Sequence, residues 1–158
     1  MRIAVSGHRG LSPDVAALID DGIRRELSRS DDADVVGLTC LADGADQIFA
    51  RAVLDHGGGL EVFVPAARYR EALPESAHRE YDELLSRAAT VHRLDHKEST
   101  AKSHMDASVA MLRHADVLFA VWDGLPARSF GGTADVVTHA RETGVPVTVI
   151  WPAGAYRS

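Results

Sequence analysis

Short apolar runs rich in β-branched residues alternate along the chain with longer stretches in which apolar residues recur every three or four positions. The run at 117–122 is apolar without alternation, which is typical of a parallel strand covered on both faces. We therefore expect it to lie inside the sheet. Together the short runs predict strands at residues 3–6, 34–40, 61–64, 91–94, 117–122 and 147–151.

The longer stretches predict the helices between those strands. Ser12-Pro13-Asp14 supplies a capping hydroxyl, a proline suited to the first turn and an early acid, and the apolar positions that follow run to Leu27. A second helix opens at Asp43-Gly44-Ala45-Asp46 and ends at the glycines 57–59. Three more helices are expected over residues 75–88, 100–114 and 133–142, the second of them burying Met105, Val109 and Leu112.

Strands that alternate with helices in this way imply right-handed crossover connections. The predicted fold is α/β: a doubly wound, Rossmann-like, three-layer fold with a mostly parallel sheet, in a single domain over residues 1–158. Such sheets bind ligands at the carboxyl ends of their strands, beside the point where the strand order reverses. Three loops of unusual composition follow predicted strands, so we expect them to meet at that edge.

The amino-acid composition argues against several classes of function. The 158 residues include 17 Lys+Arg and 23 Asp+Glu, a formal net charge of -6, which argues against nucleic acid as the main partner. The single cysteine, Cys40, excludes an intrachain disulfide and a cysteine-rich zinc site, and the scattered histidines suggest no metal site. No apolar run approaches the ~18 residues of a membrane span, and the N-terminus lacks a signal-peptide pattern. We expect a cytoplasmic protein.

The first loop, at residues 6–10, reads Ser-Gly-His-Arg-Gly directly after the first strand. Glycines permit a sharp turn and the close approach of a ligand, and the guanidinium of Arg9 suits phosphate or carboxylate. The spacing is not G-x-G-x-x-G, so a dinucleotide fingerprint is not supported. We predict that Gly7, His8 and Arg9 bind a ligand; a tight turn with a solvated arginine is the alternative.

The second loop follows the second strand and holds Asp43, Gly44 and Asp46. Asp43 could cap the next helix, and Asp46 stands where acids complement the helix dipole. Alternatively, one of these acids accepts hydrogen bonds from a ribose or a base. Both interpretations stay open, and Asp43 and Gly44 are included among the predicted ligand-binding residues.

The third loop connects the strand at 117–122 to the last helix. Gly131 and Gly132, followed by the Thr133 hydroxyl at a helix start, form a natural anion cradle of backbone N–H groups. The segment between the strand and this turn could close over a ligand; a simple connection to a capped helix is the alternative. The loop residues predicted to bind ligand are Asp123, Gly124, Ser129, Gly131, Gly132 and Thr133.

Ser-Gly-His-Arg at 6–9, Leu-Ala-Asp-Gly-Ala-Asp at 41–46, and Asp-Gly at 123–124 with Gly-Gly-Thr at 131–133 together resemble the SLOG superfamily. This Rossmann-like group contains the LOG phosphoribohydrolases, the DNA-processing protein DprA and the YspA-like proteins, and the chain looks most like the YspA branch. The resemblance covers essentially the whole chain. It implies binding of a nucleotide or nucleotide-derived ligand, and commonly a homodimer.

The same resemblance bears on catalysis. The positions that carry the catalytic arginine and glutamate of the LOG enzymes fall on Ala107 and Val136. The C-terminal part is also similar to the nucleoside deoxyribosyltransferases, whose glutamate would again coincide with Val136. Cleavage of an N-glycosidic bond requires an acid, which valine cannot supply.

We therefore expect a non-catalytic domain that binds a small phosphorylated ligand: a nucleoside monophosphate, an NAD-derived molecule or a cyclic nucleotide. No further cofactor is indicated. The alternative is an N-glycosidase, a phosphoribohydrolase or a deoxyribosyltransferase-like enzyme that uses Asp135, Asp43 or Asp123 as an atypical acid. A DNA-binding module is a third class, which the net charge of -6 disfavours.

Overall fold

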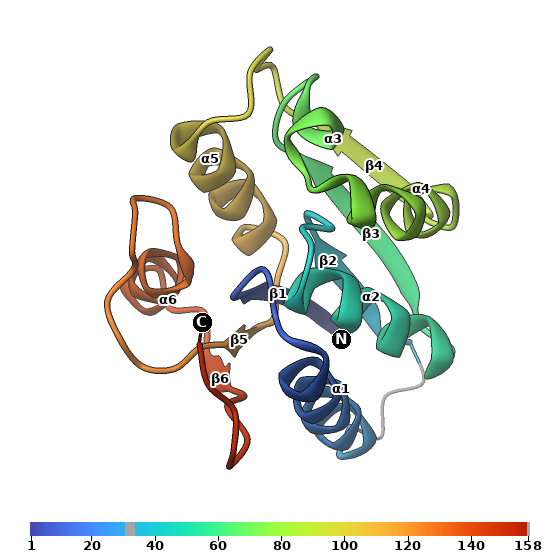
Figure 1. Ribbon diagram of the computed structural model, residues 1–158, viewed down its shortest axis with the longest axis vertical. Helices are drawn as coiled ribbons and strands as arrows, with labels where there is room; N and C mark the ends of the chain where they lie inside the picture. The colour runs from blue at the N-terminus through green and yellow to red at the C-terminus, as the bar shows by residue number, and fades with distance from the viewer. Residues whose placement is uncertain (31–33, 158) are drawn as a thin grey trace.

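The computed structural model describes residues 1–30 and 34–157 and has one 6-stranded sheet in the order β4-β3-β2-β1-β5-β6. Every neighbouring pair of strands is parallel. The predicted Rossmann-like α/β fold is confirmed (Figure 1). The strands are β1 (Arg2–Gly7), β2 (Val36–Thr39), β3 (Gly59–Val64), β4 (Thr90–Arg93), β5 (Val117–Val121) and β6 (Val147–Val149).

The helices form a layer on each face of this sheet (Figure 1). One layer consists of α1 (Pro13–Ser28), α2 (Ala45–Asp55) and α4 (His78–Ser86), and the other of α5 (Ala101–Leu112) and α6 (Thr133–Glu142). The connection from β3 to α4 contains the short α3 (Tyr69–Ala72) and the 3₁₀ turn η1 (Glu75–Ala77).

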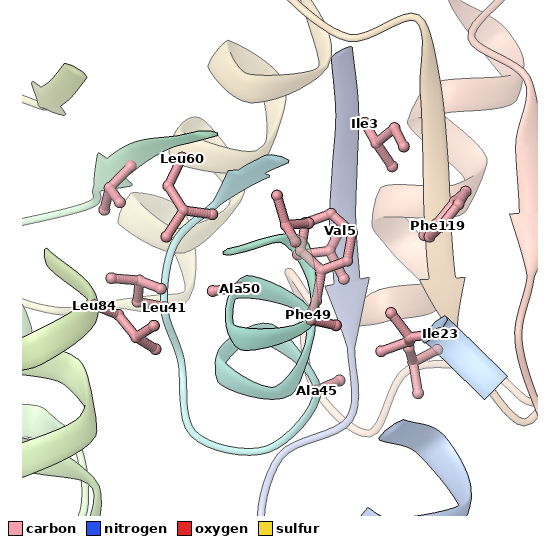
Figure 2. Close-up of a cluster of buried hydrophobic side chains, with 14 of the residues drawn as sticks. Ile3, Val5, Ile23, Leu41, Ala45, Phe49, Ala50, Leu60, Leu84 and Phe119 are labelled. Carbon is pink, nitrogen blue, oxygen red and sulfur yellow. The ribbon is translucent and has the colours of Figure 1, made fainter. Parts of the chain in front are cut away.

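Two groups of buried apolar side chains join the layers to the sheet. The larger lies under α1, α2 and α4, and Figure 2 shows part of it, with Phe49 and Phe119 packed edge to face at 6.0 Å between ring centroids. The smaller lies under α5 and α6 and includes Leu118 and Val136. Both faces of the sheet are therefore covered, which explains the unbroken apolar sequence of β5.

Two details of the helices differ from the sequence prediction. The helix expected over 75–88 begins later, at His78, because η1 precedes it, and α3 was not anticipated. In α5, Thr100 forms a capping box with Ser103, but Met105 and Val109 are only half-buried; the fully buried positions include Ala107 and Met111. Small side chains at the inward positions let α5 lie close to the sheet, which the pattern of large apolar residues could not indicate.

The chain builds β1 to β4 outward in one direction and then returns to add β5 and β6 on the other side of β1. The strand order therefore reverses between β1 and β5, and the loops that follow these two strands flank the reversal. Among the described residues, no helix is long and apolar enough to cross a membrane.

Candidate functional site

A cavity of about 300 Å³ opens at the carboxyl ends of the strands, beside this reversal. Of the residues predicted from sequence to bind ligand, the cavity lining contains Gly7, His8, Arg9, Ser129, Gly131, Gly132 and Thr133. It does not contain Asp43, Gly44, Asp123 or Gly124. The lining residues that sequence reasoning did not select include Cys40, Asp46, Tyr69, His104, Ser108 and Arg157.

Gly7 is required for packing. A Cβ at this position would lie 2.4 Å from the Cβ of Ala45 and 2.7 Å from that of Val121. The glycine thus lets β1 pass close to both α2 and β5. The sequence suggested that Gly7 gives a ligand access to the backbone. The structure shows a second reason for the glycine, because any side chain here would collide with α2 and β5.

His8 is buried and forms part of a small polar group with Asp123 and Arg157. His8 Nε2 lies 3.2 Å from the Asp123 backbone nitrogen and 3.4 Å from Asp123 Oδ1. Burial and the charge of Arg157 lower the pKa of His8. Arg157 Nη1 lies 3.2 Å from Asp123 Oδ2, and the Leu125 N–H donates to Oδ1 at 2.9 Å.

These contacts show that the carboxylate of Asp123 interacts with groups of the protein itself. Burial opposes its ionisation, but the Leu125 N–H, His8 and Arg157 together hold the pKa of Asp123 below its usual range. Asp123 therefore positions His8 and Arg157 at the cavity without lining the cavity itself.

Asp43 does not cap α2, which was one of the two roles that the sequence suggested for it. The N-cap of α2 is Gly44, with no side-chain capping bond, so the expected cap is absent. Asp43 instead accepts from Arg9 Nε at 2.8 Å and from the Gly10 N–H at 3.1 Å. It lines a second, more open cavity of about 570 Å³ between α1 and α2.

Gly44 has φ +86, and a Cβ there would lie 2.7 Å from the carbonyl oxygen of His8. Its C-terminal neighbour contacts the same oxygen, since the Ala45 N–H donates to it at 3.2 Å. Gly44 therefore allows the second loop to pack directly against the backbone of the first loop, which explains why a glycine stands at this position.

The turn before α6 presents a helix start to the cavity, but with different amides from those predicted. The Gly131 N–H donates to Asp135 Oδ2 at 2.9 Å, and the Gly132 N–H to the Ser129 carbonyl at 3.3 Å. This corrects the expectation that the two glycine amides hold an anion. Within the described part of the chain, the first-turn N–H groups of Thr133 and Ala134 have no acceptor, and the Ser6 hydroxyl reaches Thr133 Oγ1 at 3.4 Å.

The loop after β2 forms a rigid corner of the cavity. Leu41 has φ 57, a left-handed conformation that is uncommon for a bulky residue, and its side chain is buried in the core beneath α2 (Figure 2). Side chains on both sides hold the backbone: Thr39 Oγ1 accepts from the Leu41 N–H at 3.0 Å, and Gln47 Nε2 donates to the Leu41 carbonyl at 3.1 Å.

Asp46 completes this corner. Its Oδ2 accepts from the Ala42 N–H at 3.2 Å, and the residue is 8% exposed. Burial raises the pKa of Asp46 to about 7, against the opposing effects of the Ala42 N–H and of Arg9. Asp46 is the one carboxyl among the described residues that line the cavity.

Tyr69 and His104 form an aromatic wall near this corner, with their ring centroids 5.6 Å apart at an angle of 81°. Burial and the charge of Arg9 lower the pKa of His104, and its Nε2 shares a hydrogen bond of 2.7 Å with Ser99 Oγ. Cys40 lies on the same part of the lining, where burial raises the pKa of its thiol. A nucleophilic role for Cys40 is therefore disfavoured.

The two positions that correspond to LOG catalytic residues are in the interior. Ala107 is 0% exposed and Val136 is 1% exposed. The three acids proposed as substitutes, Asp135, Asp43 and Asp123, also lie outside the lining, and each accepts the hydrogen bonds described above. Within residues 1–30 and 34–157, no group of three or more histidine, cysteine or acidic side chains could hold a metal ion.

The fold and cavity define a Rossmann-like α/β protein with a polar cleft at the reversal of strand order. No family model matches the chain, and no curated protein matches it. Among solved structures, the chain is similar to DNA processing protein A from Streptococcus pneumoniae, with a TM-score of 0.70 and 16% identity over 94% of this chain and 49% of that one.

Two further solved structures have the same fold. DNA processing protein A from Helicobacter pylori, which binds single-stranded DNA, gives a TM-score of 0.70 with 15% identity, covering 98% of this chain and 67% of that one. The molybdenum cofactor binding protein from the phototrophic bacterium Rippkaea orientalis gives 0.57 with 15% identity, covering 94% and 74%. DNA processing protein A is one of the proteins in the group that the three loops resemble, and at identities of 15–16% the likeness establishes the fold alone.

Proposed function

We propose that this chain binds a small, phosphorylated, nucleotide-derived molecule in the 300 Å³ cavity, and does so without catalysis. The observation that carries the proposal is the composition of the lining. Three arginines (Arg9, Arg128 and Arg157) and the first turn of α6 border one small cavity in a chain whose net charge is -6. Positive charge concentrated there favours a small anion over a polymer, which would need a broad basic surface.

The phosphate is best accommodated at the start of α6. The N–H groups of Thr133 and Ala134 and the positive end of the helix dipole suit an anion. Arg157 and Arg128 both act on His8 electrostatically, so their charges lie near His8. Arg9 is paired with Asp43 at 2.7 Å and acts on Asp46 and His104.

A thermal-shift screen tests the proposal. The panel contains the four nucleoside monophosphates, the matching nucleosides, cyclic nucleotides, ADP-ribose and inorganic phosphate. A ligand at 100 times its Kd should add about 2.7 kcal/mol to the free energy of unfolding. The cavity volume of 300 Å³ is at the lower end of the roughly 300–1,000 Å³ of ligand pockets, so we expect mononucleotides to stabilise the protein more than ADP-ribose.

A matched pair of variants tests the phosphate site. Thr133 is the first residue of α6, where proline fits the backbone but removes both the N–H and the hydroxyl that Ser6 reaches, and alanine removes the hydroxyl alone. Thr133→Pro should therefore abolish the stabilisation by a mononucleotide, whereas Thr133→Ala keeps the N–H and should retain most of it. Equal responses of the two variants, or no response of the wild type to any member of the panel, would refute the proposal.

Two other functions have specific support and direct tests. The Helicobacter pylori neighbour binds single-stranded DNA, and a gel shift at low salt should show no such binding here. The enzymatic alternative needs an acid in the cavity, and Asp46 is present. Release of free base from a nucleoside monophosphate, lost in Asp46→Asn, would establish an enzyme in place of a binding protein.

A further inference from the structure

Asp46 is a buried acid in a cavity whose other charged lining residues are arginines. The expected partner, Arg9, is held by Asp43 through Nε at 2.8 Å and through Nη2 at 2.7 Å. Asp46 Oδ2 accepts the Ala42 N–H at 3.2 Å, while Oδ1 receives no hydrogen bond from the described residues. One oxygen of a carboxyl that is 8% exposed is therefore left for whatever occupies the cavity.

The surrounding structure fixes the position of this oxygen. Asp46 is in the first turn of α2, and the loop that it faces is held by Thr39 and Gln47 around the left-handed Leu41. A strained residue persists only where its surroundings impose it, and such residues concentrate at functional sites. The corner formed by residues 39–47 is thus a rigid element that presents Asp46 to the cavity.

The protonation state of Asp46 determines what it can recognise. A buried carboxylate without a cationic partner would repel a phosphorylated ligand, whereas a carboxylic acid carries an O–H that can donate. Burial raises the pKa of Asp46 to about 7, so the acid form is well populated near neutral pH. The other ionisable groups around it are Arg9, Cys40, Asp43 and Tyr69, with His104 and His8 further along the cavity.

The neighbours of Asp46 suit a flat ring. Tyr69 and His104 supply an aromatic wall, and Pro65 and Cys40 add apolar surface to the same lining. A purine or pyrimidine base packs well against such side chains, and its ring nitrogens and carbonyl oxygens accept hydrogen bonds. The opposite end of the cavity, at Thr133, provides N–H groups for a phosphate.

We propose that Asp46, as a carboxylic acid, donates a hydrogen bond to the base of a nucleoside monophosphate that packs against Tyr69 and His104. This inference rests on the proposed function and assigns base recognition to Asp46, in place of the predicted Asp43 and Asp123. Asp46 acts in it as a specificity residue: it distinguishes a nucleotide with a base from a sugar phosphate without one.

The experiment compares two probes by titration calorimetry: the tightest-binding of the four nucleoside monophosphates, and ribose 5-phosphate, which lacks the base. Wild type, Asp46→Asn and Asp46→Ala are each titrated at pH 6 and pH 8.5. Asparagine keeps the shape and an N–H donor but does not titrate, so its pH profile contains the contributions of His8, His104 and the phosphate alone.

For the wild type, we expect the nucleotide to bind about tenfold more weakly at pH 8.5 than at pH 6, after subtraction of the change seen in Asp46→Asn. Asp46→Asn should bind the nucleotide within about threefold of wild type at pH 6. Asp46→Ala should lose roughly three- to tenfold in affinity for the nucleotide. At pH 6, where Asp46 is mostly uncharged, ribose 5-phosphate should bind all three proteins alike.

The outcomes separate this inference from the proposed function. If the nucleotide binds and Asp46→Ala leaves its affinity unchanged, the role of Asp46 is refuted while phosphorylated-ligand binding stands. The same conclusion follows if wild type and Asp46→Asn have the same pH profile. If neither the nucleotides nor ribose 5-phosphate bind, both proposals are wrong.

Discussion

The loop after β2 and the loop between β5 and α6 both border the cavity, but they are held by different means. In the first, the buried side chain of Leu41 anchors the backbone, and Thr39, Asp46 and Gln47 bond to it. The second exposes Leu125 and Phe130, at 59% and 62%, and arches widely around the end of α6 in Figure 1. A rigid corner suits recognition of a ring, whereas an open loop leaves a way in for the ligand.

The largest predicted difference between the two regions is in the contribution of a leucine. Leu41→Ala should lower the free energy of unfolding by about 2–5 kcal/mol, because it opens a cavity in the core. Leu125→Ala should change it by less than about 0.5 kcal/mol. Denaturant unfolding measures the free energy of unfolding of both variants. Equal losses of stability would contradict the difference between the two loops.

The second prediction concerns pH and the rigid corner. Burial raises the folded-state pKa of Asp46 from its ordinary value of 3.8 to about 7, so the folded protein holds this proton more tightly than the unfolded chain. Wild-type stability should therefore fall between about pH 4 and pH 7 through this residue. Asp46→Asn removes the effect and should gain up to about 3 kcal/mol relative to wild type between pH 5 and pH 8.

Unfolding curves of both proteins at pH 5, 6, 7 and 8 provide the measurement. Other ionisable groups contribute equally to both, so the difference between the two curves isolates Asp46. A difference that does not change with pH would show that Asp46 is already ionised in the folded protein at pH 5.

A pair of glycines compares the close packing of the two loops. Gly44 and Gly124 both have positive φ, +86 and +82, so alanine introduces similar backbone strain at each. At Gly44 the new Cβ would also lie 2.7 Å from the His8 carbonyl oxygen, whereas at Gly124 it meets nothing within 4 Å. Thermal unfolding should show Gly44→Ala to be about 1–3 kcal/mol less stable than Gly124→Ala; the reverse order would contradict the packing described.

The smallest predicted effect lies within the open loop. Asp135→Ala removes the acceptor of the Gly131 N–H and should cost about 1 kcal/mol of unfolding free energy. Because the cavity does not contain Asp135, affinity for a mononucleotide should change less than threefold, as calorimetry can measure. Complete loss of binding in this variant would instead show that Asp135, considered from the sequence as a catalytic acid, has a direct role in the site.

Sequence periodicity was sufficient to predict the order of the strands and main helices along the chain. The reason is that the spacing of apolar residues reflects whether one or both faces of an element are buried. Gly7, Arg9 and Thr133 could be assigned to the strand ends for the same reason, and the cavity lining contains all three. The expected single domain and the expected dimer stay predictions.

The acids could not be assigned from sequence. Asp43 and Asp46 are three residues apart at a helix start, yet one turns outward to Arg9 and the other inward to the cavity. The left-handed conformation of Leu41 in the same loop was not anticipated either, because a leucine gives no sign of it in a sequence. Tyr69 and Arg157 were missed for a related reason, because the first belongs to a short helix after β3 and the second to the C-terminal end of the chain.

A crystal structure of the protein with its tightest-binding nucleoside monophosphate would locate the ligand. We predict that the phosphate binds the N–H groups of Thr133 and Ala134 and that the base packs against Tyr69 and His104, within hydrogen-bond distance of Asp46. A nucleotide bound instead in the second cavity, beside Asp43, Arg24 and Arg51, would contradict this prediction.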